Sequence, residues 1–150
     1  MTDKVSKSKR SMNMSAIKSR DTTPEVYFRK KLFSLGLRYR KNFVNINGHP
    51  DLFFSKFNTA VFVNGCFWHR HNGCKFAYTP KSNIDFWIEK FNRNLARDQF
   101  VREKLYSQNI KCLIIWECTI DKMKRDISYE SAIIDIVISF FSNNELFLEI

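Results

Sequence analysis

The sequence has little that would divide the chain or place it in a membrane. Only four glycines and three prolines occur among 150 residues, and no linker, internal repeat or low-complexity block is visible. The N-terminal residues lack an apolar run, so we expect no signal peptide. The most apolar late stretch, AIIDIVISFF, is interrupted by Asp135 and is too short to cross a bilayer. We therefore expect a cytoplasmic protein with a flexible basic segment at residues 1–13 and a single domain at residues 14–150.

Acidic residues are scarce. The chain has 15 Asp and Glu residues against 25 Lys and Arg residues, which gives a formal net charge of +10. Residues 1–41 alone carry a net +9, whereas residues 126–150 contain no Lys or Arg and carry −5. This balance indicates a polyanionic partner, most often nucleic acid and less often an acidic membrane surface, bound through the first three quarters of the chain.

The hydrophobic pattern predicts an α/β domain. The stretch DTTPE predicts the start of a helix that ends at Gly36, with either Thr23 before Pro24 or Thr22 with Glu25 as the cap. A later helix is expected to begin with Ser82 and Asp85 as a capping pair. The other expected boundaries are strands at residues 37–40, 51–54, 59–63 and 110–116 and helices at 82–108 and 128–141. The order α-β-β-β-α-β-α predicts a mixed central sheet flanked by helices.

Cysteine and histidine gather in one short stretch, GCFWHRHNGC at residues 65–74. Thiols in a reducing compartment favour metal binding over disulfides. Cys66, His71 and Cys74 have the ligand types and close spacing of a structural zinc site. His69 competes with His71 for the histidine position, because residues i and i+2 of an extended segment share a face.

The fourth zinc ligand must come from elsewhere in the chain. Cys112 lies inside the apolar strand predicted at 110–116, where it fits a small core residue. Cys118 lies at the end of that strand, where the chain leaves the sheet. We therefore prefer Cys118 as the fourth ligand.

A second metal site is suggested by Asp51. It follows Pro50 after a turn, opens a strand and precedes Val63 by 12 residues. A carboxylate at the mouth of a sheet is a natural ligand for Mg²⁺, although an Asp after Pro is most simply a turn residue. Glu25 is most simply a helix-start acid favoured by the helix dipole.

Several of these motifs together resemble a known family. The segments HPD, AVFVNGCFWHRHNGC, TPKSNIDFWIEKFNRNLARD and IIWEC, with MSAIKSRDTTPE near the start, closely resemble the very short patch repair endonucleases. These bacterial enzymes nick one DNA strand at T:G mismatches. The likeness runs from about Ser11 to Cys118. It implies a restriction-endonuclease-like PD-(D/E)xK core and magnesium-dependent nicking in the repair of deaminated 5-methylcytosine.

The resemblance also implies roles for single residues. Asp51 matches the residue that binds Mg²⁺, and Val63 matches a position whose backbone carbonyl reaches the same ion. That position can be threonine in the family, so any hydroxyl role is lost here. His69 matches the histidine that activates water, and Glu25 matches an acidic residue near the active site. The family assigns the zinc ligands as Cys66, His71, Cys74 and Cys118, which leaves His69 for the chemistry.

Contacts to DNA are implied in the same way. Phe67, Trp68 and Trp87 match aromatic residues that wedge into DNA beside the mismatch. Trp87 also falls on the apolar face of its helix, which is typical of a core residue. In a strand, Phe67 and Trp68 would point to opposite faces, so one of them would be exposed. The candidate phosphate contacts are Arg20, Arg29, Lys81, Arg93 and Arg97.

The expected partner is double-stranded DNA with a T:G mismatch. The resemblance further implies contact with the mismatch-repair protein MutL, and we expect a nucleoid-associated monomer. Two alternatives remain at this point. One is a restriction-type endonuclease of the same fold that cuts both strands of matched DNA. The other is a zinc-stabilised DNA-binding module without catalysis, which the charge and the cysteine cluster would also explain.

Overall fold

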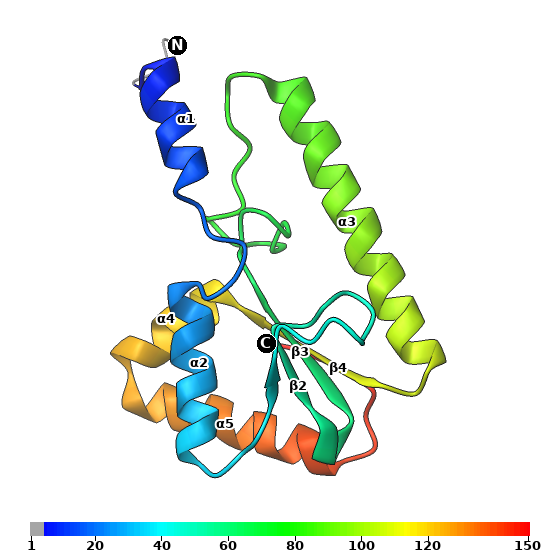
Figure 1. Ribbon diagram of the computed structural model, residues 1–150. Helices are drawn as coiled ribbons and strands as arrows, with labels where there is room; N and C mark the ends of the chain where they lie inside the picture. The colour runs from blue at the N-terminus through cyan, green and yellow to red at the C-terminus, as the bar shows by residue number, and fades with distance from the viewer. Residues whose placement is uncertain (1–4) are drawn as a thin grey trace.

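A mixed five-stranded sheet organises the protein. The computed structural model describes residues 5–150 (Figure 1). The strands are β1 (Arg40–Lys41), β2 (Leu52–Phe54), β3 (Thr59–Asn64), β4 (Lys111–Trp116) and β5 (Phe147–Glu149), in the spatial order β1-β2-β3-β4-β5. β1, β2 and β3 pair antiparallel, whereas β4 runs parallel to both β3 and β5. The predicted meander, crossover and mixed sheet are therefore confirmed.

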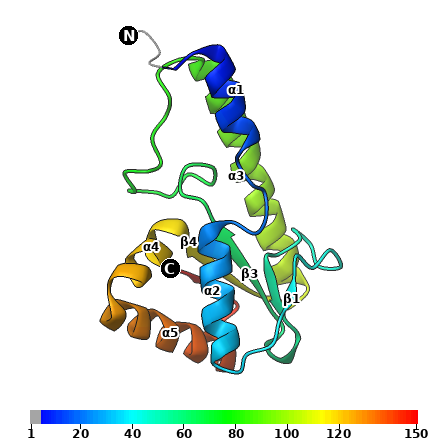
Figure 2. The ribbon, with the colours of Figure 1, turned by 60° about the vertical axis from the view of Figure 1, so that its left-hand side comes forward.

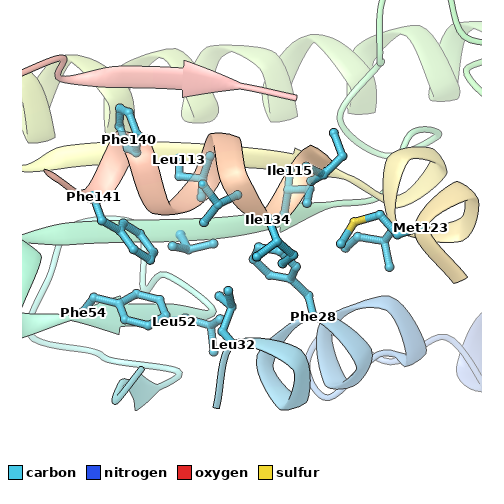
Figure 3. Packing of buried hydrophobic residues seen from close by; sticks show 14 residues of the cluster. Phe28, Leu32, Leu52, Phe54, Leu113, Ile115, Met123, Ile134, Phe140 and Phe141 are labelled. Atoms are coloured by element: carbon cyan, nitrogen blue, oxygen red, sulfur yellow. The ribbon is translucent and has the colours of Figure 1, made fainter. Parts of the chain in front are cut away.

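Helices cover both faces of this sheet. The helices of residues 5–150 are α1 (Lys7–Ser15), which lies away from the sheet (Figure 1), α2 (Thr23–Ser34), α3 (Ile84–Ser107), α4 (Glu117–Arg125) and α5 (Ile127–Ser142), with a 3₁₀ turn at Ser55–Phe57. Leu52, Val61 and Leu113 face one side, where they pack with residues of α2, α4 and α5 (Figure 3). Ala60 and Cys112 face the other side, which the C-terminal part of α3 covers. The period-two alternation of the strands thus produces two hydrophobic layers.

The predicted start and end of α2 are confirmed, whereas the strand predicted after it is largely wrong. Thr22 is the N-cap, and its hydroxyl accepts a hydrogen bond from Glu25 N at 3.4 Å. Gly36 has a φ of +83°, and the Leu37 amide still bonds to Leu32 O at 3.2 Å. The strand predicted at 37–40 is wrong except at its last residue, because the chain is still closing the helix at Leu37 and pairs with β2 only through β1.

The start of α3 differs from the prediction. Asn83, in the left-handed conformation with a φ of 53°, precedes the first helical residue. Ser82 does not begin a capping pair with Asp85; its hydroxyl accepts a hydrogen bond from Arg10 Nη1 at 3.3 Å. This bond connects α1 to the segment that leads into α3. Both helices project from the same end of the molecule (Figure 2).

Two α-helices and one strand of the described residues were not predicted. α4 follows β4 directly, and Asp126 ends it and caps α5 by accepting a bond from Tyr129 N at 3.1 Å. β5 adds an edge strand that carries part of the acidic tail. Residues 7–13 of the segment expected to be flexible belong to α1, and residues 1–4 lie outside the described part of the chain. Within residues 5–150, no helix combines the length and apolar character needed to span a bilayer.

Candidate active site and metal centre

Four soft ligands meet at one edge of the sheet. One donor atom from each of Cys66, His71, Cys74 and Cys118 lies within 4.8 Å of all the others. His71 Nδ1 is 3.5 Å from Cys66 Sγ and 3.4 Å from Cys118 Sγ. A tetrahedral ion with a Zn–S bond of about 2.3 Å and a Zn–N bond of about 2.05 Å would separate such atoms by about 3.5 Å. The donor set and its spacing therefore fit a tetrahedral metal ion.

The parallel pairing of β3 and β4 brings these ligands together. Asn64 at the end of β3 lies opposite Trp116 at the end of β4, so the loop after β3 and the first turn of α4 leave the same edge. His71 N bonds to Cys66 O at 3.0 Å, and the His71 ring stacks on Trp116 with centroids 4.2 Å apart. Cys118 is therefore a candidate ligand, whereas Cys112 is buried on the face under α3, as predicted.

The electrostatics of the cluster suit a cation. Burial, together with the neighbouring thiols, raises the pKa of Cys66 to about 12, and burial also raises the pKa of Cys118. Burial lowers the pKa of His71, which favours the neutral, ligating imidazole. A bound cation would offset the cost of the buried thiolates.

Asp51 occupies the mouth of the sheet next to β3. Its Oδ2 accepts a hydrogen bond from the Val63 amide at 2.7 Å. Burial raises the pKa of Asp51 to about 7; the Val63 bond and the charge of His69 lower it, and the charge of Glu25 raises it. Glu25, which is only 2% exposed, also has a raised pKa because of burial. A divalent cation bound by Asp51 would offset both its burial and the charge of Glu25.

His69 has a partner that the sequence did not suggest. Its Nδ1 lies 2.6 Å from Asp98 Oδ2 on α3, with 24% and 31% of the two side chains exposed. The partner fixes one ring nitrogen and leaves Nε2 available for chemistry. Asp98 is the last residue of the segment TPKSNIDFWIEKFNRNLARD, which resembles the family, but nothing in that segment singles it out as the partner of His69.

His69 and His71 do not share a face, because the segment that carries them is not extended. Residues 66–70 form turns rather than a strand, and Arg70 between the two histidines has a φ of 54°. His69 points to Asp98, whereas His71 belongs to the thiol cluster. The two histidines therefore occupy different environments.

A hollow of about 760 Å³ opens beside His69. It is bounded by the α1–α2 connection, the end of β3, the middle of α3 and the first residue of α4. Val63, Trp68 and His69 line it. Its basic lining residues are Lys18, Lys90 and Arg97. This arrangement can accept an anionic polymer with His69 at one wall.

The candidate wedge residues form a packed aromatic cluster. The Phe67 ring lies 5.0 Å from Trp68, 5.4 Å from Trp87 and 5.2 Å from Phe91, measured between centroids. Trp87 is 9% exposed. Phe67 and Trp68 are both half-buried, because they lie in a turn and not in a strand. The expectation that one ring is buried and the other exposed is therefore wrong.

The candidate phosphate contacts lie in different surroundings. Arg97 lines the hollow, and its Nη2 donates to Asn94 Oδ1 at 3.4 Å. Arg20 and Arg93 are exposed, and Lys81 lies exposed in the loop before α3. Arg29 is instead committed to an internal network, with Nη1 2.5 Å from Asp21 and 3.5 Å from Glu25.

Comparison with known proteins identifies similar DNA endonucleases. The family described as DNA mismatch endonuclease Vsr matches residues 2–75. The type II nicking enzyme V.NmeAIP of Neisseria meningitidis is 47% identical over 118 residues, covering 79% of this chain and 84% of that protein. The type II nicking enzyme V.XorIIP of Xanthomonas oryzae is 36% identical over 82% of this chain and 90% of its own length.

A mismatch endonuclease is among the similar proteins. The DNA mismatch endonuclease Vsr of Escherichia coli is 35% identical over 120 residues, covering 80% of this chain and 76% of that protein. The resemblance found in the sequence motifs is therefore confirmed over most of the chain. The chain belongs to the Vsr family of DNA mismatch endonucleases and is a DNA endonuclease.

Proposed function

We propose that the protein is a magnesium-dependent endonuclease that nicks one strand of double-stranded DNA at T:G mismatches. The observation that carries this proposal is the placement of Asp51, bonded to the Val63 amide, within electrostatic range of His69. Val63 and His69 line a hollow whose other lining residues include Lys18, Lys90 and Arg97. The biological role would be very short patch repair of deaminated 5-methylcytosine.

The fold proposal is a restriction-endonuclease-like PD-(D/E)xK core. Its support is a meander joined by α3 to a parallel strand, with Asp51 directly before β2. We further propose that residues 14–150 form a single nuclease domain and that the basic segment at 1–13 before it binds along the DNA backbone.

The proposed reaction is attack of a water oxygen on the scissile phosphorus. His69 Nε2 takes the proton from that water, while Nδ1 keeps its bond to Asp98. As the new P–O bond forms, the P–O bond to the leaving oxygen breaks, and that oxygen takes a proton from solvent water. The products are a phosphate end and a hydroxyl end. Asp51 and the Val63 carbonyl would hold Mg²⁺, with Glu25 as a nearby second carboxylate. When bound, Mg²⁺ stabilises charge on the phosphate and lowers the pKa of water.

The thiol–imidazole cluster is proposed to hold Zn²⁺ in a structural role. Four protein ligands close the coordination sphere, which is typical of structural zinc. The ion would tie the loop after β3 to the start of α4. His69 lies within that loop, so a fixed loop keeps the imidazole beside Asp51.

Mismatch preference is proposed to come from the aromatic cluster. Phe67, Trp68 and Trp87 would insert between base pairs, and a mismatched step is cheaper to open than a matched one. The phosphate contacts would come from Arg20, Lys81, Arg93 and Arg97. The protein is expected to act as a nucleoid-associated monomer and to contact MutL.

The test is cleavage of strand-labelled duplexes that differ only in one T:G pair. With Mg²⁺, the wild-type protein should nick one strand of the mismatched duplex, and Asp51→Ala should bind it but leave it intact. Cuts in both strands of matched DNA would establish the restriction-type alternative. Binding without any cut would leave a zinc-stabilised DNA-binding module and refute the proposal.

A further inference from the structure

Arg70 occupies a position where a large side chain is unusual. It stands between His69 and His71 with a φ of 54°, in the left-handed region that disfavours residues with a Cβ. Such a conformation persists only when surrounding contacts hold it. The contacts of Arg70 are therefore informative about why this backbone is kept.

The guanidinium group of Arg70 supplies those contacts. Nη1 donates to Tyr78 O at 2.9 Å and to Phe67 O at 3.5 Å, and Nη2 donates to Thr79 Oγ1 at 3.1 Å. Its Cζ lies 3.9 Å from the centre of the Phe91 ring, which is 4% exposed on α3. One side chain thus joins the turn at residues 67–71, the following loop and α3.

The left-handed residue decides where its two neighbours point. In an extended chain, His69 and His71 would face the same way. Here His69 Nδ1 reaches Asp98 on α3, whereas His71 Nδ1 lies 3.4 Å from Cys118 Sγ and its ring stacks on Trp116. The reversal at Arg70 keeps one imidazole in the hollow and the other in the metal cluster.

We propose that Arg70 is a positioning residue for strand nicking, acting through His69. Its guanidinium holds the reversal by stacking on Phe91 and by bonding to the carbonyls of Phe67 and Tyr78. The assignment rests on the proposed function of His69 as the group that accepts the proton. Arg70 itself touches neither the water nor the scissile phosphate in this scheme.

Arginine suits this task better than its usual replacements. A lysine keeps the charge but has one compact ammonium group, which cannot stack flat on Phe91 and bond to several separate acceptors at once. A glycine accepts the positive φ without strain but provides no anchor. Arg70→Lys therefore tests whether the charge alone is sufficient, and Arg70→Gly tests whether the backbone conformation alone is sufficient. Both replacements remove the guanidinium contacts.

The test compares Arg70→Lys and Arg70→Gly with the wild-type protein. Nicking of the T:G duplex is measured at saturating DNA to give kcat, and binding is measured separately on the same duplex with Ca²⁺ in place of Mg²⁺. The matched control is Arg125→Lys, a change at an exposed arginine in the last turn of α4. A chromophoric chelator measures how fast zinc leaves the zinc-loaded proteins.

The expected result is a loss in kcat without a loss in binding. Arg70→Lys and Arg70→Gly should each lower kcat by about 10- to 100-fold, because a misplacement of about 1 Å can cost that much. Arg70→Lys should bind DNA within about threefold of wild type, since the charge is retained. Zinc should leave both variants on the order of tenfold faster, in line with the loss of a group that supports metal ligands.

Three results would overturn the assignment. Wild-type kcat in Arg70→Lys would show that the planar group is dispensable. Wild-type kcat in Arg70→Gly would show that only the backbone conformation matters. Weaker DNA binding by Arg70→Lys at unchanged kcat would make Arg70 a DNA contact. If Arg70→Gly does not fold, Arg70→Lys decides. If the wild-type protein does not nick DNA, the proposed function fails, and zinc release still tests whether Arg70 holds the turn.

Discussion

The bond between His69 and Asp98 gives a prediction that can be worked from the structure. Asp98→Ala removes the group that lies 2.6 Å from His69 Nδ1 and leaves the imidazole free to rotate. The residues at the thiol cluster are untouched by this change. The expected effect is a lower kcat for nicking with the fold and the DNA affinity retained.

The size of the loss follows from the strength of a charge-assisted hydrogen bond. Such a bond contributes about 1.5–3 kcal/mol, and the partial exposure of both side chains places this one near the lower end, at about 1.5–2 kcal/mol. Each 1.36 kcal/mol is tenfold in rate, so Asp98→Ala should lower kcat by about 10- to 30-fold. Asp98→Asn keeps a neutral hydrogen bond of about half the strength, so it should lower kcat only about fourfold.

Single-turnover nicking of a T:G duplex at saturating enzyme is the assay. His69→Ala sets the ceiling, at roughly 10²- to 10⁴-fold for a general base. Asp98→Ala should add nothing further in the His69→Ala background, because its whole effect passes through the imidazole. The reasoning would be contradicted if Asp98→Ala lowered the nicking rate by the same factor in the wild-type and His69→Ala backgrounds. It would also be contradicted by an Asp98→Ala rate within twofold of wild type.

The remaining predictions concern the metals, the site acid and the core. Free zinc at about a thousandfold above its Kd contributes about 4 kcal/mol to the stability of the folded protein. Removal of zinc should therefore lower Tm by roughly 8–16 °C, which calorimetry with and without a chelator measures. Folding raises the pKa of Asp51 from 3.8 to about 7, so this group's contribution to stability declines as pH rises between those values. Asp51→Asn should therefore stabilise the magnesium-free protein at pH 8, by on the order of 2–4 kcal/mol, and much less at pH 4, as urea unfolding would show. Phe28→Ala, at a fully buried position, should cost about 3–5 kcal/mol in the same assay, against about 1 kcal/mol or less for Phe33→Ala, which is 53% exposed on the same helix.

Local chemistry in the sequence was sufficient for much of the fold. The cap at Thr22, which was one of two alternatives, the stop at Gly36 and the apolar runs of β3 and β4 each depend on neighbouring residues, and the structure agrees with all three. α4 was missed because it begins without a side-chain cap directly after the apolar strand. β5 was missed because its few residues become a strand only by pairing with β4.

The candidate site shows the same division. The thiol cluster could be predicted because three of its ligands are close in sequence and Cys118 follows a recognisable strand. The role of Asp98 could not be predicted, because it lies 29 residues after His69 in the sequence. The two side chains meet only through the way α3 packs against the rest of the domain. The turn at Arg70 was also missed, since a positive φ at arginine has no sequence signature.

The length of α3 has a mechanical consequence. The helix has 24 residues, or about 36 Å, and Leu105 near its end is fully buried against the sheet. Trp87 lies about 27 Å from that pivot along the axis and Asp98 only about 10 Å. A tilt that carries Trp87 by 3 Å thus carries Asp98 by about 1 Å, enough to change the rate of a step that depends on its alignment. With Trp87 inserted into DNA as proposed, such a tilt would couple the fit of that ring between the base pairs to the alignment of Asp98 with His69.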